Sequence, residues 1–300
     1  MYPQPPLKNP IARDLQWLVS APPLLAEVKR FPQHSPPERK ALARGIDGFI
    51  QTLETMSEQE AAQTIGMKGW RVGHYFEALV TAWIQHLPQW EVLGKDVQVT
   101  QEKRTLGAFD FIVRNPEGGI EHWEVAVKYY LLLGQPDDWA CWIGPNQRDR
   151  LDKKVNRMRD HQLALSTRPE AHAALQRLGV DRIHQRVALL KGILFSPWGT
   201  TVTQPTYAQS TPQGRWVEVS NLKKLQHSTP ASRWMKREKP YWLAPIRKEG
   251  DATDFTDLPH GVQRPEMWAR LTQAEDGMWE EAERWFLVPD GWSSGDTATQ

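Results

Sequence analysis

The sequence has only one cysteine, Cys141, among its 300 residues. A single thiol cannot form an intramolecular disulfide, and it cannot build a zinc site from cysteines. The nine histidines show no metal-ligand spacing such as H-E-x-x-H. The P-loop, dinucleotide-binding and G-x-S-x-G motifs are also lacking. The sequence therefore excludes a disulfide scaffold and offers none of the common nucleotide-binding, zinc or serine-hydrolase motifs.

Long apolar runs and a strong net charge are also lacking. No stretch approaches the roughly 18 continuous apolar residues of a membrane span. The first residues, "MYPQPPLKNP", contain prolines where a signal peptide would need an apolar run. The formal net charge is only +1, so any surface that binds nucleic acid must be local. We expect a cytoplasmic protein with the composition of a globular fold.

Helical and strand-like runs alternate along the first two thirds of the chain. Residues 1–68 are expected to form a helical N-terminal segment, and "GWRVGHYFEALVTAWIQHLP", residues 69–88, predicts a stronger helix. Three β-rich runs follow, "WEVLGKDVQVT", "TLGAFDFIVR" and "EHWEVAVKYYLL". A helix, "GPNQRDRLDKKVNRMRDHQLALS", and an apolar strand, "RVALLKGILFSPW", complete residues 69–198. This order predicts an α/β (α+β) fold with a mixed sheet flanked by helices.

The last third of the chain is rich in tryptophan. Residues 199–215 predict a linker or a long loop, because Thr, Gln, Ser and Pro dominate there. Residues 216–292 form a Trp-rich C-terminal region, interpreted as a small second domain, and residues 293–300 a disordered tail. The fifteen Trp side chains have two interpretations, packing in cores and interfaces or stacking on bases and sugars. We expect this region to shape a substrate channel or to bind a protein partner.

The second and third strands place three charged residues on one face of the sheet. Glu124 and Lys128 share one face of "HWEVAVKYYL", and Asp110 lies on the polar side of "AFDFIVR". The turn "NPEGG" joins the two strands as an antiparallel hairpin. A register that keeps the polar and apolar faces separate sets Asp110 opposite Glu124 or Ala126. All three charged side chains then project to the same side.

Two carboxylates and one ammonium on a common face have a known chemical use. The carboxylates hold a hard divalent cation such as Mg²⁺ through oxygen ligands. The metal lowers the pKa of a bound water and neutralises charge on a phosphate. The lysine orients the attacking water or stabilises the negative charge of the transition state.

With "GAFDF" on the second strand and "EVAVK" on the third, the sequence resembles the PD-(D/E)XK nuclease superfamily. Within it, the match is to an uncharacterised bacterial branch, the domain-of-unknown-function family 1853. The resemblance is clearest over residues 69–198. It implies a restriction-endonuclease-like αβββαβ core, cleavage of DNA or RNA, and Mg²⁺ or Mn²⁺ as the cofactor. It gives Asp110 the aspartate role, Lys128 the lysine role, and Glu77, on the preceding helix, the acidic role that completes the metal site.

The sequence departs from the superfamily pattern at two positions. Ala126 lies two residues before the lysine, where the superfamily has Glu or Asp. Glu124 lies two residues further back on the same face, displaced by about 6 to 7 Å along the strand. We expect Glu124 to act as a migrated metal ligand. Phe109 replaces the proline that precedes the aspartate.

The helix that follows the third strand is expected to contact the nucleic-acid backbone. Cationic and polar side chains gather there, and the predicted contacts are Gln147, Arg148, Lys153, Lys154 and Arg157. The competing interpretation is a solvated helix face with ion pairs, because aspartates lie among the cations.

These patterns favour a metal-dependent nuclease, with DNA as the expected substrate and with Asp110, Glu124 and Lys128 as catalytic residues. The alternative is a non-catalytic nuclease-like module that binds nucleic acid or a protein partner, and Ala126 is its main support. A purely structural partner-binding protein is the third interpretation. A last interpretation gives these charges no functional role: Asp110 pairs with a cation, Glu124 and Lys128 form a surface ion pair, and Glu77 is a helix-surface charge.

Overall fold

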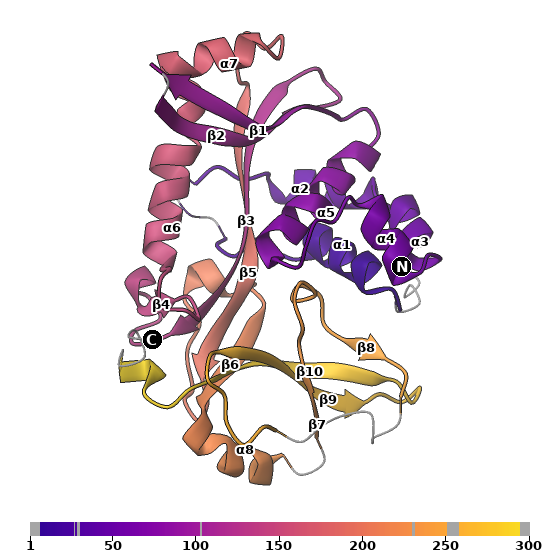
Figure 1. Ribbon diagram of the computed structural model, residues 1–300, viewed down its shortest axis with the longest axis vertical. Coiled ribbons are helices and arrows are strands. Elements are labelled where there is room, and N and C mark those ends of the chain that lie inside the picture. Colours follow the sequence, from indigo (N-terminus) through magenta and orange to yellow (C-terminus); the bar gives the residue numbers. More distant parts are fainter. Residues whose placement is uncertain are drawn as a thin grey trace.

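The computed structural model describes residues 7–26, 28, 31–102, 104–229, 232–250 and 258–294. Within these residues the chain forms eight α-helices and one mixed sheet of ten strands (Figure 1). The predicted mixed α/β class is therefore confirmed. None of the helices in this part of the chain is long and apolar enough to cross a membrane.

Four helices precede residue 68, and side-chain caps fix where three of them begin. They are α1 (Pro10–Ser20), α2 (Pro36–Arg44), α3 (Asp47–Glu54) and α4 (Glu58–Thr64). Asn9 accepts two backbone N–H groups at the start of α1. Ser35 with Glu38 and Ser57 with Glu60 form capping boxes at α2 and α4. These caps satisfy N–H groups that have no partner inside the helix.

The helix predicted over residues 69–88 is α5 (Val72–His86). Its wide apolar stripe includes Tyr75, Leu79 and Trp83, all buried. The stripe packs in one core with α1 to α4 and with one face of the sheet. Pro88 follows the last turn, where it cannot extend the hydrogen-bonded helix. The apolar spacing of the sequence thus located this helix.

The strands form one continuous sheet. Seven of them follow the chain as β1 (Glu91–Gln101), β2 (Arg104–Arg114), β3 (Ile120–Leu132), β4 (Trp142–Ile143), β5 (Gln185–Pro197), β6 (Gln213–Glu218) and β7 (Arg233–Lys236). The last three are β8 (Arg247–Lys248), β9 (Glu266–Gln273) and β10 (Trp279–Val288). The sheet order is β1-β2-β3-β5-β6-β10-β9-β7, with β4 paired to β3 and β8 paired to β10. The neighbours β3, β5, β6 and β10 run parallel, and the other pairs are antiparallel.

Helices cover both faces of the long β3–β5 pair (Figure 1). Trp123, Val125 and Val127 of β3 face the core formed with α1 to α5. Tyr130 and Leu132 face the opposite core, which contains α6 (Leu151–Arg157). Beyond α6, a short helix, α7 (His172–Gln176), packs over the β1–β2 end of the sheet. Burial on both sides explains why β5 is almost wholly apolar.

The sheet continues through the segment that the sequence presents as a linker. Residues 199–215 contain a short turn at Thr206–Ala208 and the first residues of β6. Because β6 pairs in parallel with β5, the Trp-rich C-terminal region extends the same sheet. Helix α8 (Leu222–Ser228) packs against this end with Trp234, Trp268 and Trp285. Of the expected disordered tail, residues 295–300 lie outside the described residues.

Candidate functional site

Asp110 lies where two paired strands separate. β2 pairs with β3 only from Phe111 opposite Trp123 to Arg114 opposite Ile120, while β1 stays paired with β2 along its whole length. Extended by one position, this register sets Asp110 opposite Glu124, as the alternation of the two strands predicts. At the opening, Asp110 Oδ2 accepts a hydrogen bond from the N–H of Val125 at 2.9 Å. The Asp110 carboxyl group thus takes the place of a backbone carbonyl as the acceptor for Val125 N–H. We call this point, where β2 and β3 separate, the fork.

Asp110 and Glu124 meet as a carboxyl pair. Burial and the nearby charge of Glu124 raise the pKa of Asp110 to about 7. Burial likewise raises the pKa of Glu124 to about 7, and the neighbouring Asp110, Lys154 and Gln162 oppose that shift. Two carboxylates this close cannot both ionise without a counter-charge. The pair therefore shares a proton near neutral pH or holds a cation.

Glu124 is fully buried, and two side chains hold it in place. His122 Nε2 lies 2.8 Å from Glu124 Oε1. Gln162 Nε2 donates to Glu124 Oε2 at 2.5 Å. Burial lowers the pKa of His122 to about 4, so the imidazole is neutral and its other nitrogen lies 3.1 Å from Ser166 Oγ. The sequence patterns gave no role to His122 and no sign of Gln162.

A π-helical turn brings Gln162 to the site. The turn spans Met158–Gln162 directly after α6, and the N–H of Leu163 donates to the carbonyl of Met158 at 2.9 Å. Gln162 Oε1 accepts from Lys154 Nζ at 3.2 Å, so residues eight positions apart lie on one face. In a regular α-helix they would be about 80° apart. Turns of this type occur often at functional sites.

Lys154 is the ammonium that interacts with the carboxyl pair. It is half-buried, and its positive charge acts on both Asp110 and Glu124. Burial and the nearby Lys128 lower its pKa, whereas both carboxyl groups oppose that shift. Lys154 was predicted as a contact to the nucleic-acid backbone, and it lies beside Gln162, which holds Glu124.

Lys128 lies further along β3 and makes a different contact. Its Nζ donates to Asp149 Oδ2 at 2.6 Å, with both side chains about one third exposed. Asp149 also accepts from the N–H of Arg150. Four residues separate Lys128 from Glu124, or about 13 Å along the strand. The Lys128–Asp149 pair therefore borders the site, and the sequence did not identify Asp149.

Glu77 approaches the carboxyl pair from α5. It is half-buried, and burial together with the charges of Asp110 and Asp96 raises its pKa. A third carboxyl group thus lies close enough to Asp110 to interact with it electrostatically.

The donor set suits a hard divalent cation. Within the described residues, no group of three or more His, Cys, Asp or Glu side chains is placed to hold a metal ion. Magnesium in proteins commonly uses only one or two carboxylates and completes its shell with water. The carboxyl pair provides two such ligands, with Glu77 within electrostatic reach. A cation there would replace the proton that the pair otherwise shares.

Of the remaining predicted nucleic-acid contacts, one makes a hydrogen bond within the protein and three are exposed to solvent. Gln147 donates its side-chain amide to the carbonyl of Trp292 at 2.5 Å, so it joins the C-terminal region to the loop before α6. Arg148 is exposed beside the Lys128–Asp149 pair. Lys153 and Arg157 are exposed on the outer side of α6.

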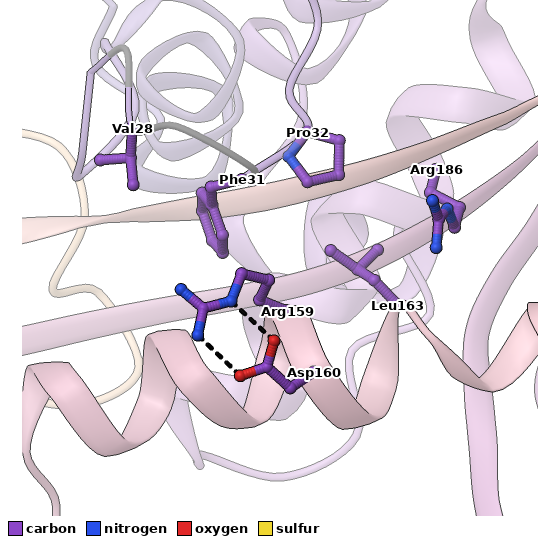
Figure 2. A pocket seen from close by; sticks show the side chains of 7 residues that line it. All are labelled: Val28, Phe31, Pro32, Arg159, Asp160, Leu163 and Arg186. Atoms are coloured by element: carbon purple, nitrogen blue, oxygen red, sulfur yellow. Dashed lines mark hydrogen bonds and ion pairs between the residues drawn. The ribbon is translucent and has the colours of Figure 1, made fainter.

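A separate hollow of about 670 Å³ lies over the outer surface of the π-helical turn (Figure 2). Phe31 and Leu163 form much of its wall. Arg159 there pairs with the adjacent Asp160 at 2.7 Å, and Arg186 is the other charged side chain. This hollow is distinct from the carboxyl pair and brings no second cluster of acidic groups together.

The chain was compared with known protein families, curated proteins and solved structures. Residues 13–288 match the family model described as Domain of unknown function (DUF1853). No curated protein and no solved structure matches the chain.

Proposed function

The chain belongs to the family Domain of unknown function (DUF1853), and from its site we propose that it is a metal-dependent nuclease that hydrolyses phosphodiester bonds, with DNA as the expected substrate. The observation that carries the proposal is the buried carboxyl pair, Asp110 and Glu124, at the fork between β2 and β3. The restriction-endonuclease-like core and the PD-(D/E)XK assignment belong to the same proposal. The order α5, β1, β2, β3, α6, β5, interrupted by the two-residue β4 before α6 and by the short α7 before β5, supports them.

The residues around the pair divide the work of the reaction. Asp110 and Glu124 would hold Mg²⁺ or Mn²⁺, and Glu77 would assist directly or through a water. When bound, the cation lowers the pKa of a water and neutralises phosphate charge. Lys154, whose charge reaches both carboxyl groups, would stabilise the added negative charge at the phosphate. His122 and Gln162 fix the orientation of Glu124. Lys128 with Asp149 positions the adjacent phosphate of the nucleic-acid strand.

The alternative is a nuclease-like module that binds nucleic acid or a protein partner without cutting. Two observations favour it. Ala126 leaves no acid at the usual position, and both oxygens of Glu124 already accept hydrogen bonds from His122 and Gln162.

Asp110→Asn separates the two proposals. The variant keeps the shape of the side chain but removes one of the two charges, so we expect a folded protein that no longer binds metal. Calorimetric titration with Mn²⁺ should show heat for the wild type and none for the variant. Incubation with linear, circular and single-stranded DNA and with RNA should show cleavage that EDTA stops and that Asp110→Asn reduces by about a hundredfold or more.

The matched control is Asp276→Asn, an exposed aspartate that pairs with Arg247 far from the site. It should bind metal and cut as the wild type does. Lys154→Met and Lys128→Met show which ammonium serves the reaction, and we expect the larger loss of turnover from Lys154→Met. A wild-type chain that binds no divalent cation contradicts the nuclease proposal and favours the non-catalytic module.

A further inference from the structure

A basic groove of about 690 Å³ lies beside the candidate site. One wall is the chain that enters α5, at Trp70 and Arg71. A second is the end of β3 with the loop 144–149, and the third comes from residues 236–242 and 264–267 of the C-terminal region. Three parts of the sequence that are far apart therefore build one surface.

Positive charge dominates this groove. Seven Lys or Arg side chains and three Asp or Glu side chains line it, although the whole chain has a net charge of only +1. Arg71, Arg148 and Arg264 are exposed, and within the described part of the chain none of the three has an ion-pair partner. Unpaired guanidinium groups in a concave surface are suited to phosphate, which they bind through two parallel N–H groups. The groove is therefore a locally basic surface in a chain that is nearly neutral overall.

Trp70 is the second unusual feature of the groove. All fifteen Trp residues lie in the described part of the chain, and Trp70 is the one that is exposed, at 68%. The other indole in the groove, Trp242, is half-buried and has Lys239 Nζ over its ring at 5.0 Å. An exposed indole next to unpaired arginines is the arrangement used to stack a base beside its phosphates. Bases inside a duplex already stack on each other, so Trp70 selects an unpaired base.

The groove adjoins the border of the candidate site. Lys128 and Asp149 belong to both the groove and the border of the site. Trp70 and Arg71 directly precede α5, and Glu77 lies five residues after its first residue, Val72, or about 8 Å along the helix. A nucleic-acid strand that continues past this end of the groove would therefore approach the fork between β2 and β3.

We propose that this basic groove binds a single-stranded segment of nucleic acid, with a base stacked on Trp70 and phosphates on Arg71, Arg148 and Arg264. The proposal deepens the proposed nuclease function by naming the form of its substrate. Binding in the groove needs neither metal nor cleavage, so it can be measured separately.

The test measures binding of fluorescent oligo-dT and oligo-rU by anisotropy, with the full chain in EDTA. Trp70→Ala should weaken binding by about tenfold, while Trp70→Phe should retain most of it because a ring remains to stack. Replacing Arg148 and Arg264 by Ala should reduce the salt slope of the affinity by about 0.7 for each lost phosphate contact. Lys40→Ala, an exposed cation on α2 away from the groove, is the matched control and should bind as the wild type does.

A blunt duplex of the same length is the second probe. We expect it to bind more weakly than oligo-dT and to be insensitive to Trp70→Ala. Oligonucleotide binding that none of the groove variants changes overturns the proposal, and so does a duplex that binds as tightly as oligo-dT and depends equally on Trp70. Metal-free binding that depends on Trp70 supports the groove even if no cleavage is found. The comparison of oligo-dT with oligo-rU then shows which sugar the groove prefers.

Discussion

Lys191 is an uncommon residue because its ammonium is buried without a carboxylate. The side chain is only 3% exposed, and its Nζ donates to the carbonyl of Ala21 at the end of α1. Burial, with the nearby charge of Arg39, lowers the pKa of Lys191 to about 7. In the unfolded chain the pKa returns to about 10.4. Between these two values the unfolded state binds one more proton than the folded state.

This difference predicts how stability depends on pH. The free energy of unfolding of the wild type, minus that of Lys191→Met, should rise by about 1.4 kcal/mol per pH unit between pH 7.5 and 9.5. Below pH 7 the difference should be flat, because Lys191 is then charged in both states. Urea unfolding at several pH values measures it. For Lys40→Met, at an exposed position, the difference in free energy of unfolding from the wild type should not change with pH. A difference for Lys191→Met that also stays constant would contradict the prediction.

At the scale of single residues, the sequence predicted those parts of the site that depend on one strand or one hairpin. The alternation in β2 and β3 brought Asp110 opposite Glu124, because side-chain direction along a strand has a fixed period. Phe109 does not follow this alternation, because β2 leaves β3 at Asp110. Its ring packs against the ring of His122, with the two ring centroids 4.8 Å apart. Gln162 could not be found, because its approach depends on a π-helical turn that has no sequence pattern.

The pairing of β3 with β5 shows how two elements fix the position of Lys128. Gly192 of β5 lies opposite Lys128 in the parallel register. A Cβ added at Gly192 would lie 1.9 Å from the carbonyl oxygen of Lys128, so the two strands would have to move apart. The absence of a side chain at this one position allows the close approach.

Gly192→Ala should therefore destabilise the protein. We expect the free energy of unfolding to fall by about 3 kcal/mol or more, as in other overpacked cores. Urea unfolding measures this, with an unchanged denaturant slope showing that the unfolded state is the same. The matched control is Gly48→Ala in α3, where no atom lies within 4 Å of the added Cβ. That substitution should be neutral or slightly stabilising, because alanine restricts the unfolded chain. Equal stability of the two variants would contradict the argument.

At the scale of elements, the sequence predicted what the period of apolar residues encodes. α5, β3 and β5 were all located this way, because each buries a regular apolar stripe or face. It could not predict that β10 joins β6 in parallel, since strand partners far apart in the chain leave no local pattern. The exposed position of Trp70 was equally hidden, because burial depends on what the rest of the chain covers.

A buried polar network joins the two ends of the molecule. Glu281 of β10 pairs with Arg237 and Arg284 at 2.6 Å, and all three side chains are nearly inaccessible. Arg284 also binds the carbonyl of Ala244 at 2.8 Å, and the N–H of Ala244 donates to Asp14 of α1 at 2.7 Å. The N-terminal helices and the C-terminal strands are therefore linked by one set of contacts.

Glu281→Gln tests whether these parts unfold together. Burial opposes the ionisation of Glu281, yet the two guanidinium groups hold its pKa below the usual value. Losing that charge leaves two buried guanidinium groups without their carboxylate partner, which should cost about 3 to 5 kcal/mol. Amide hydrogen exchange should then be faster in α1 as well as in β10, because Asp14 of α1 is bound by the N–H of Ala244, whose carbonyl binds Arg284. Asp276→Asn, whose ion pair is half-exposed, should leave both elements protected. Faster exchange in β10 with α1 unchanged would mean that the network does not couple the two ends, and that the C-terminal region opens as a unit of its own.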